Sequence, residues 1–342
     1  MTRAALLLAC VAATASVACS SGGATRRGLD GATDAPSTDA TATDATATDG
    51  ATDANAIDDA ANDADAQEVA APSLFGDIAV DLVTDQFTGF AAQFFDAESV
   101  PTIPVDVSQT TDGCQLLVPR TISCAAGCGA NSVCVGMDLC ARQPAPVDVG
   151  TLHVEGLGAT PLDLEPTSQT ILSYPVVPTL PYPACAEGGD VTARATAFAV
   201  AGKCVGALEV TSPAPIPVTT GQATHLAWRV PGHAGISRIQ VVLEISHHGG
   251  YAGELDCDVP DTGAFDLPAP LVTALVARGR AGYPTIKLAR VSTTAAAAEP
   301  GVRLTVSSRA ELPVDTGVIS CGADGSPPCP LGTACATNYT CR

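Results

Sequence analysis

Fourteen cysteines, twelve of them beyond residue 73, place the strongest constraint on how this 342-residue chain can fold. Segments of 17 and 21 residues hold four cysteines each, with the spacings C-x3-C-x5-C-x5-C and C-x7-C-x5-C-x5-C. Such short segments cannot bury an apolar core, so cross-links must hold them. The similar spacings predict one small module used twice. The eight residues are Cys124, Cys128, Cys134 and Cys140, then Cys321, Cys329, Cys335 and Cys341.

The second cluster contains Cys329-Pro330-Leu331-Gly332-Thr333-Ala334-Cys335, and both clusters resemble the short C…CxxGxxC…C modules of extracellular proteins, of the Dickkopf or EGF-like kind. The first cluster lacks the Pro-x-Gly step. We expect disulfides from the first to the third and from the second to the fourth cysteine, although the spacing leaves the connectivity open. A zinc site is the alternative, but the clusters contain no C-x2-C pair and no flanking histidine.

Four further cysteines lie in strand-like segments, and two structural disulfides among them are expected. An even number of cysteines is typical of an exported chain, in which as many as six disulfides would form here. The shortest loop would be closed by a bridge between Cys185 and Cys204. The four residues are Cys114, Cys185, Cys204 and Cys257.

The N-terminus has the features of a secretory signal over residues 1–18. Arg3 precedes 15 uncharged residues, too few to span about 30 Å of hydrocarbon as a helix. The stretch ends in Ser16-Val17-Ala18-Cys19 and resembles the lipobox of bacterial lipoproteins, with a serine where that family prefers leucine. The resemblance implies lipidation of Cys19, for example with palmitate. The alternatives are an earlier lipobox at Cys10 and a secreted protein cut near Ala18.

The lipidated end is followed by an acidic linker, so that residues 19–72 form one region. Between residues 28 and 72 there are ten Asp and one Glu but no Lys or Arg. Such a segment cannot bury enough apolar surface to offset the entropy of ordering, so we predict disorder and a reach of about 40 Å or more. The Asp/Thr/Ala linker resembles that of myxobacterial-type surface lipoproteins, which implies a spacer. A cation-binding tail is the alternative.

Beyond residue 73, alternating apolar residues between Pro and Gly turns predict an all-β fold. The strictest alternation runs through Ile239, Val241, Leu243 and Ile245. Further strands are expected at 148–156, at 190–200 with one apolar face, at 283–292 and at 302–307. One helix is expected at 268–278, ending before Gly279.

The segment Thr224-His225-Leu226-Ala227-Trp228-Arg229-Val230-Pro231-Gly232 and the strand after it are similar to the B–C region of fibronectin type III and Ig-like domains. The resemblance implies that Trp228 lies in the core of a β-sandwich at 211–310. We place a first β domain at 73–210, with a cysteine-rich insert at 114–140, and a cysteine-rich module at 311–342. The chain would thus hold one or two β-sandwich domains, two disulfide-rich modules and the linker.

Composition limits the partners and the chemistry. The net charge is −20, and beyond residue 73 there are still 25 acidic against 13 basic residues. This balance argues against nucleic acid, because phosphate binding is driven by Lys and Arg. The sequence contains no G-x-S-x-G elbow, P-loop or dinucleotide-binding loop.

One ionisable cluster deserves comparison with known sites. His247 and His248 precede Asp256 and Asp258, which share a strand face, and Asp261. The simpler interpretation is a solvated strand end with Asp261 capping a turn. A metal-dependent hydrolase or a calcium-stabilised adhesin is the alternative. His153 is expected to be a surface residue of a strand, and for His225 and His233 the sequence indicates no partner.

These patterns lead to one functional expectation. We expect a lipoprotein without catalytic residues, metal or cofactor, anchored through Cys19 to the outer membrane and facing the periplasm or the cell surface. The residue after Cys19 is serine rather than the aspartate that retains some lipoproteins in an inner membrane. The protein would present its disulfide-stapled β domains to an unknown protein or polysaccharide ligand, for binding, adhesion or envelope scaffolding.

Overall fold

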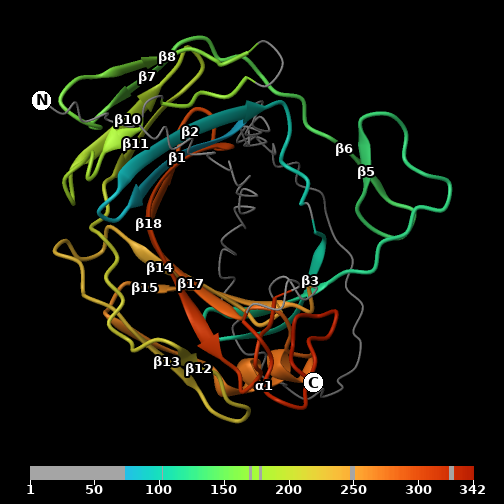
Figure 1. Ribbon diagram of the computed structural model, residues 1–342. Coiled ribbons are helices and arrows are strands. Elements are labelled where there is room, and N and C mark those ends of the chain that lie inside the picture. Colours follow the sequence, from blue (N-terminus) through green and yellow to red (C-terminus); the bar gives the residue numbers. More distant parts are fainter. Residues whose placement is uncertain (1–73, 102, 169–171, 177–178, 247–250, 323–326) are drawn as a thin grey trace, which may run out of the picture. The chain divides into compact units, whose positions relative to one another are not determined.

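The computed structural model describes residues 74–101, 103–168, 172–176, 179–246, 251–322 and 327–342. The signal, Cys19, the linker, His247 and His248 lie outside the described residues. Strands dominate the described part of the chain, which agrees with the all-β expectation, and its one helix is α1 (Ala269–Ala277) (Figure 1).

Ten strands form one large sheet. In chain order they are β1 (Phe75–Val83), β2 (Phe87–Phe95), β3 (Val105–Thr111), β4 (Cys114–Pro119), β9 (Leu180–Pro181), β12 (Ile216–Pro217), β14 (Arg238–Glu244), β15 (Glu254–Pro260), β17 (Thr285–Ala295) and β18 (Val302–Asp315). Their order in the sheet is β3-β4-β15-β14-β17-β18-β1-β2-β9, with β12 beside β18. β1 and β12 run parallel to β18, and the other neighbours are antiparallel.

Three smaller sheets complete the strand pairing of the described residues. The first has the order β11 (Ala199–Lys203), β10 (Asp190–Arg194), β7 (Leu152–Glu155) and β8 (Leu162–Leu164). In the second, β13 (Thr224–Ala227) pairs with β16 (Ala264–Leu267). In the third, β5 (Ser132–Cys134) pairs with β6 (Cys140–Arg142).

The strictest alternation in the sequence becomes β14. Ile239, Val241 and Leu243 are fully buried, while their neighbours along the strand are less so. Side chains two apart lie on the same face of a strand, so the pattern places these three residues on the interior face, while Val242 lies on the other face and is partly buried. The expected helix also forms, and it buries Leu271 and Leu275 against the sheet.

The single strand expected at 190–200 is a hairpin, so that prediction was wrong. β10 ends at Arg194, the amide of Ala195 donates to the carbonyl of Phe198 at 3.0 Å, and β11 returns from Ala199. Val191 and Ala193 are buried as expected, but after the turn Phe198 and Val200 are the buried residues. The alanines keep alternating through the turn, so the pattern alone does not show it.

Buried side chains form two groups. The first core lies between the β7–β8–β10–β11 sheet and strands β1, β2 and β18, and it contains Phe94 and Leu304. The second core is formed by β13, β16 and α1 against β4, β14, β15 and β17, and it contains Leu243 and Ile286. Each core is therefore enclosed by two layers, as in a sandwich.

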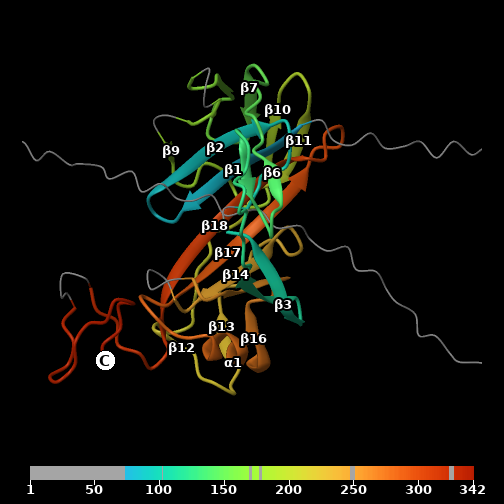
Figure 2. The ribbon, with the colours of Figure 1, turned by 90° about the vertical axis from the view of Figure 1, so that its right-hand side faces the viewer.

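The two cores share the large sheet. Val302 and Leu304 at the start of β18 belong to the first core, whereas Val314 near its end belongs to the second. β17 pairs with β18 along eleven register positions, and the two long strands run from one group of elements to the other (Figure 2). Strands from both sides of residue 210 thus lie in one sheet, although the segments 73–210 and 211–310 supply most of one core each.

Candidate functional site

The twelve described cysteines form six disulfides. In both clusters the first cysteine is bonded to the third and the second to the fourth, as expected. Cys185–Cys204 closes the β10–β11 region, and Cys114–Cys257 joins β4 to β15. Three sulfurs in each cluster lie within 4.8 Å of one another, but each is already bonded to a second sulfur. None of them is a thiolate available to zinc.

Module 1 (Cys124–Cys140) and module 2 (Cys321–Cys341) have the same turn after the second cysteine. The amides of Ser132 and Thr333 donate to the carbonyls three residues earlier, at 3.2 and 3.1 Å. Asn131 and Gly332 lie at the same place in these turns, with φ angles of 60° and 89°. Asparagine tolerates this left-handed conformation better than other residues with a side chain. Asn131 therefore fulfils the backbone role of Gly332, and the missing Pro-x-Gly step does not change the turn.

The modules also share the loop between their third and fourth cysteines. In both, these two cysteines face each other across an antiparallel bridge. The amide after the third cysteine donates to the carbonyl before the fourth, at 2.8 Å in module 1 and 2.9 Å in module 2. Asp138 and Tyr339 occupy the same left-handed position, with φ angles of 51° and 58°. The structure thus confirms that one module is used twice.

Both modules expose apolar side chains. Met137 and Leu139 of module 1 are 68% and 59% exposed, and Leu331 of module 2 is fully exposed. Ile122 and Ile319, each two residues before the first cysteine of a module, are exposed as well. These five are the majority of the nine large apolar side chains that are exposed among the described residues. Exposed apolar side chains are thus concentrated in and next to the two modules.

Asp96 fastens the chain where it leaves module 1. Its carboxylate accepts hydrogen bonds from Nη1 of Arg142 at 3.0 Å and from the amide of Ala145 at 2.8 Å. The bond from Arg142 and the bond from Ala145 stabilise the charged form, so they lower the pKa of Asp96 below its ordinary 3.8. The lowered pKa means that the carboxylate ion, rather than the neutral acid, makes these two hydrogen bonds. They join the end of β2 to β6 and to the segment after it.

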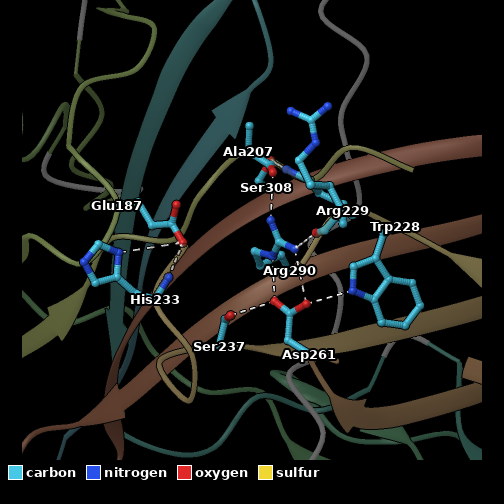
Figure 3. Close-up of polar contacts among 10 residues, drawn as sticks. Glu187, Ala207, Trp228, Arg229, His233, Ser237, Asp261, Arg290 and Ser308 are labelled. Carbon is cyan, nitrogen blue, oxygen red and sulfur yellow. Dashed lines mark hydrogen bonds and ion pairs between the residues drawn. The ribbon is translucent and has the colours of Figure 1, made fainter. Parts of the chain in front are cut away.

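A buried ion pair joins Arg290 of β17 to Asp261, and both side chains are 2% exposed (Figure 3). Nε and Nη2 of Arg290 donate to the two carboxylate oxygens at 2.6 and 3.2 Å. The indole of Trp228 and the hydroxyl of Ser237 each donate to Asp261 at 2.7 Å. Each carboxylate oxygen therefore accepts two hydrogen bonds, which offsets the cost of burying the charge.

The same arginine holds the chain where it passes between the two cores. Arg290 donates to the carbonyl of Ala207 at 2.8 Å and to that of Arg229 at 2.6 Å. Ala207 lies between Val205, which belongs to the first core, and Leu208, which belongs to the second. The burial and the neighbours of this ion pair therefore indicate a structural role at the junction of the cores.

The aspartates expected near His247 and His248 do not gather into one site. The carboxylate of Asp261 accepts its hydrogen bonds from side chains, above all that of Arg290, so the expectation that it caps a turn was wrong. Asp258 accepts a hydrogen bond from Nε of Arg238 at 2.6 Å, and both side chains are about half exposed. Asp256 lies on β15 opposite Gln115 and Val242. The two histidines lie outside the described residues.

Each described histidine has a carboxylate partner. His153 on β7 lies 2.6 Å from Asp163 on β8, which fits the expected surface position on a strand. The sequence indicated no partner for His233, yet its amide donates to Glu187 at 3.0 Å and its Nδ1 lies 3.9 Å from the same carboxylate oxygen (Figure 3). His225, the third, also has a partner, Asp266.

A serine, a histidine and an aspartate come together in a way the sequence did not reveal. Ser212 and His225 line a cavity of about 370 Å³, and Nδ1 of His225 lies 2.7 Å from Asp266. The hydroxyl of Ser212 accepts a hydrogen bond from the amide of Ala227 at 2.6 Å, and in the described part of the chain it makes no bond to His225. A nucleophilic triad has a hydrogen bond between the serine and its base, and this contact is not formed among the described residues.

The geometry thus defines a disulfide-stapled β protein that carries a repeated cysteine module with exposed apolar residues. In the part of the chain that the structure describes, no helix has the length and apolarity needed to cross a bilayer. No protein-family model matches the chain, and no curated protein is recognisably similar to it.

Proposed function

We propose that the protein is an exported lipoprotein, anchored to the outer membrane through a lipid on Cys19. Its acidic linker acts as a spacer, and its folded region presents the two cysteine modules to a protein or polysaccharide ligand. The role is binding, adhesion or envelope scaffolding rather than catalysis.

One observation carries this proposal: all twelve described cysteines are paired, and eight of them form one module twice. Disulfides persist in oxidising compartments, which is where a chain with the signal of residues 1–18 would be delivered. Small modules held by cross-links keep a fixed surface without needing a core. Their exposed apolar residues supply the contact surface that a binding role requires.

The lipid anchor is tested by changing Cys19 to alanine in the full chain. We expect the variant to move from the membrane to the soluble fraction and to lose incorporation of labelled palmitate, because no acyl chain can be attached. Cys10→Ala is the matched control and should leave both unchanged. Retention of the Cys19→Ala variant in the membrane would refute the anchor at this residue. Release of the Cys10→Ala variant instead would identify Cys10 as the lipidated residue.

A metal-dependent hydrolase or a calcium-stabilised adhesin is the second candidate, built on His247, His248, Asp256 and Asp258. The ion pair between Asp258 and Arg238 favours the binding role, since it already neutralises one of the carboxylates.

A further inference from the structure

Three arginines line one cavity in this otherwise acidic protein. The cavity has a volume of about 290 Å³ and lies among the end of α1, the segment before β15 and module 2. Arg278 and Arg280 come from the chain just after α1, and Arg342 comes from the segment that follows Cys341. Among the described residues, the lining contains no aspartate or glutamate side chain; its other members are Ser246, Tyr251, Ala252, Gly279, Ala281 and Asn338.

These three arginines differ from most other basic residues of the chain. Of the thirteen Lys and Arg beyond residue 73, nine form ion pairs with carboxylates among the described residues. Three of the other four are Arg278, Arg280 and Arg342. Among the described residues, the arginines without a carboxylate partner thus share one cavity, in a region with 25 acidic residues. Guanidinium groups stay charged at any physiological pH, so each of the three contributes a permanent positive charge to the lining.

Hydrogen bonds to carbonyls fix two of these arginines and leave donors over. Nε of Arg278 donates to the carbonyl of Ala252, and Nη1 of Arg280 donates to that of Thr316. A guanidinium group has five N–H donors, so each retains several. The oxygen of the Asn338 side chain already accepts a bond from Thr340 at 2.8 Å, and its NH₂ group is therefore a further donor in the lining.

Module 2 completes the cavity because it is held against the body of the protein. The amide of Gly282 donates to the carbonyl of Asn338 at 2.8 Å, and the rings of Tyr283 and Tyr339 are in contact. Arg342 is paired through its backbone with Ala334 of the module, at 2.9 and 3.0 Å. The three charges thus come from two parts of the chain that these contacts bring together.

We infer that this cavity binds an oxyanion: a phosphate, sulfate or carboxylate group, free or carried by a larger ligand. Planar guanidinium groups match such groups with paired N–H donors. An acidic surround repels anions in general, so a ligand must gain its affinity from the three arginines at close range. The inference does not depend on the lipid anchor, and it would survive if that anchor were disproved.

The test uses the full chain, purified in non-ionic detergent, and titrates it with inorganic phosphate and with citrate in a calorimeter at constant ionic strength. We expect saturable binding of at least one anion. Binding should weaken about tenfold or more in the triple variant Arg278→Gln, Arg280→Gln and Arg342→Gln, because several charge-assisted hydrogen bonds are lost. The triple variant Arg194→Gln, Arg238→Gln and Arg309→Gln removes three exposed arginines that have carboxylate partners, and it should bind as the unchanged chain does.

The two anions distinguish the possible ligands. Binding of phosphate alone identifies a tetrahedral oxyanion, and binding of citrate alone identifies a carboxylate; both results support the site. Absence of saturable binding to either anion in the unchanged chain would overturn the inference, as would an equal loss in both triple variants. Emission from Trp228, the only tryptophan, shows whether each variant keeps its second core.

Discussion

At the scale of the residue, the ion pair of Arg290 and Asp261 differs from the other pairs by its burial. Arg194 and Glu155 form a comparable contact at 3.1 Å, but their side chains are 62% and 46% exposed. Water screens the exposed pair and solvates either partner when the other is removed. The buried partners have no such alternative, so the loss of one leaves the other charged and desolvated.

We therefore expect Asp261→Ala to lower the free energy of unfolding by about 3–5 kcal/mol, because Arg290 would remain buried without a counter-charge. Arg194→Ala, the exposed comparison, should cost about 1 kcal/mol or less. Denaturant unfolding followed by circular dichroism measures both values. Similar small losses in the two variants would show that water reaches Arg290.

Asp96 gives a prediction that depends on pH. Its pKa is lower in the folded protein than the ordinary 3.8, so its contribution is present above that value and is lost as the pH falls through the folded pKa. We expect Asp96→Asn to reduce the hydrogen-exchange protection of the Ala145 amide at about pH 7, and the difference to shrink as the pH falls below 3.8 and through the lower folded pKa. A difference that persists in acid would mean that the charge of Asp96 does not hold this segment.

At the scale of the element, the two modules show how different sequences reach one backbone. Asn131 and Gly332 meet the same left-handed requirement, one through the tolerance of asparagine and the other through the absence of a side chain. Asp138 and Tyr339 meet it at the second loop, where tyrosine adds the ring contact with Tyr283.

Substitution at Asn131 tests that requirement. Asn131→Gly should leave module 1 unchanged or more stable, whereas Asn131→Val should destabilise it by about 1–2 kcal/mol, since a β-branched residue is strained at this φ angle. The readout is the rate at which dithiothreitol reduces Cys128–Cys140, mapped by mass spectrometry. Ser132→Val, one residue later in β5, is the control and should not accelerate reduction. Equal rates of disulfide reduction in Asn131→Val and Ser132→Val would contradict a left-handed requirement at residue 131.

At the scale of the whole molecule, two cores depend on one sheet. β18 has residues in both, and Arg290 holds the segment that passes from one to the other. Loss of packing in one core should therefore also destabilise the other core, because β17 and β18 connect them. We therefore expect the two cores on either side of residue 210 to unfold as one cooperative unit.

Phe94→Ala tests this coupling. Phe94 is fully buried in the first core, so its truncation should cost about 3–5 kcal/mol. We expect the unfolding transition reported by Trp228, which lies in the second core, to shift to lower denaturant by the same amount as the transition seen by circular dichroism. A Trp228 transition that stays in place while the first core melts would show two independent domains.

Local patterns predicted much of this fold. The alternation in β14 and the helix α1 follow from the period of the apolar residues. The burial of Trp228 was expected from the resemblance to the B–C region of fibronectin type III and Ig-like domains. The expected pairing within both modules is also the one observed, although the spacing itself leaves the connectivity open. The β10–β11 turn was not predicted because alanine fits either face of a strand.

The candidate sites were less accessible from sequence. The partnership of Asp261 with Arg290 joins residues 29 apart, and only the pairing of strands brings them together. Arg278, Arg280 and Arg342 look like isolated surface charges until module 2 is placed beside α1. Tertiary contacts of this kind leave no periodic signal in the chain.

The parallel pairing of β1 with β18 has a mechanical consequence. β1 is the first described strand after the linker, and its residues 76–82 match residues 302–308 of β18 one for one, while β2 covers its other edge. A pull transmitted along β1 from its N-terminal end would load these hydrogen bonds together, in shear, instead of opening them one at a time. Under the proposed lipid anchor, this pairing would resist force at the point where the linker enters the fold.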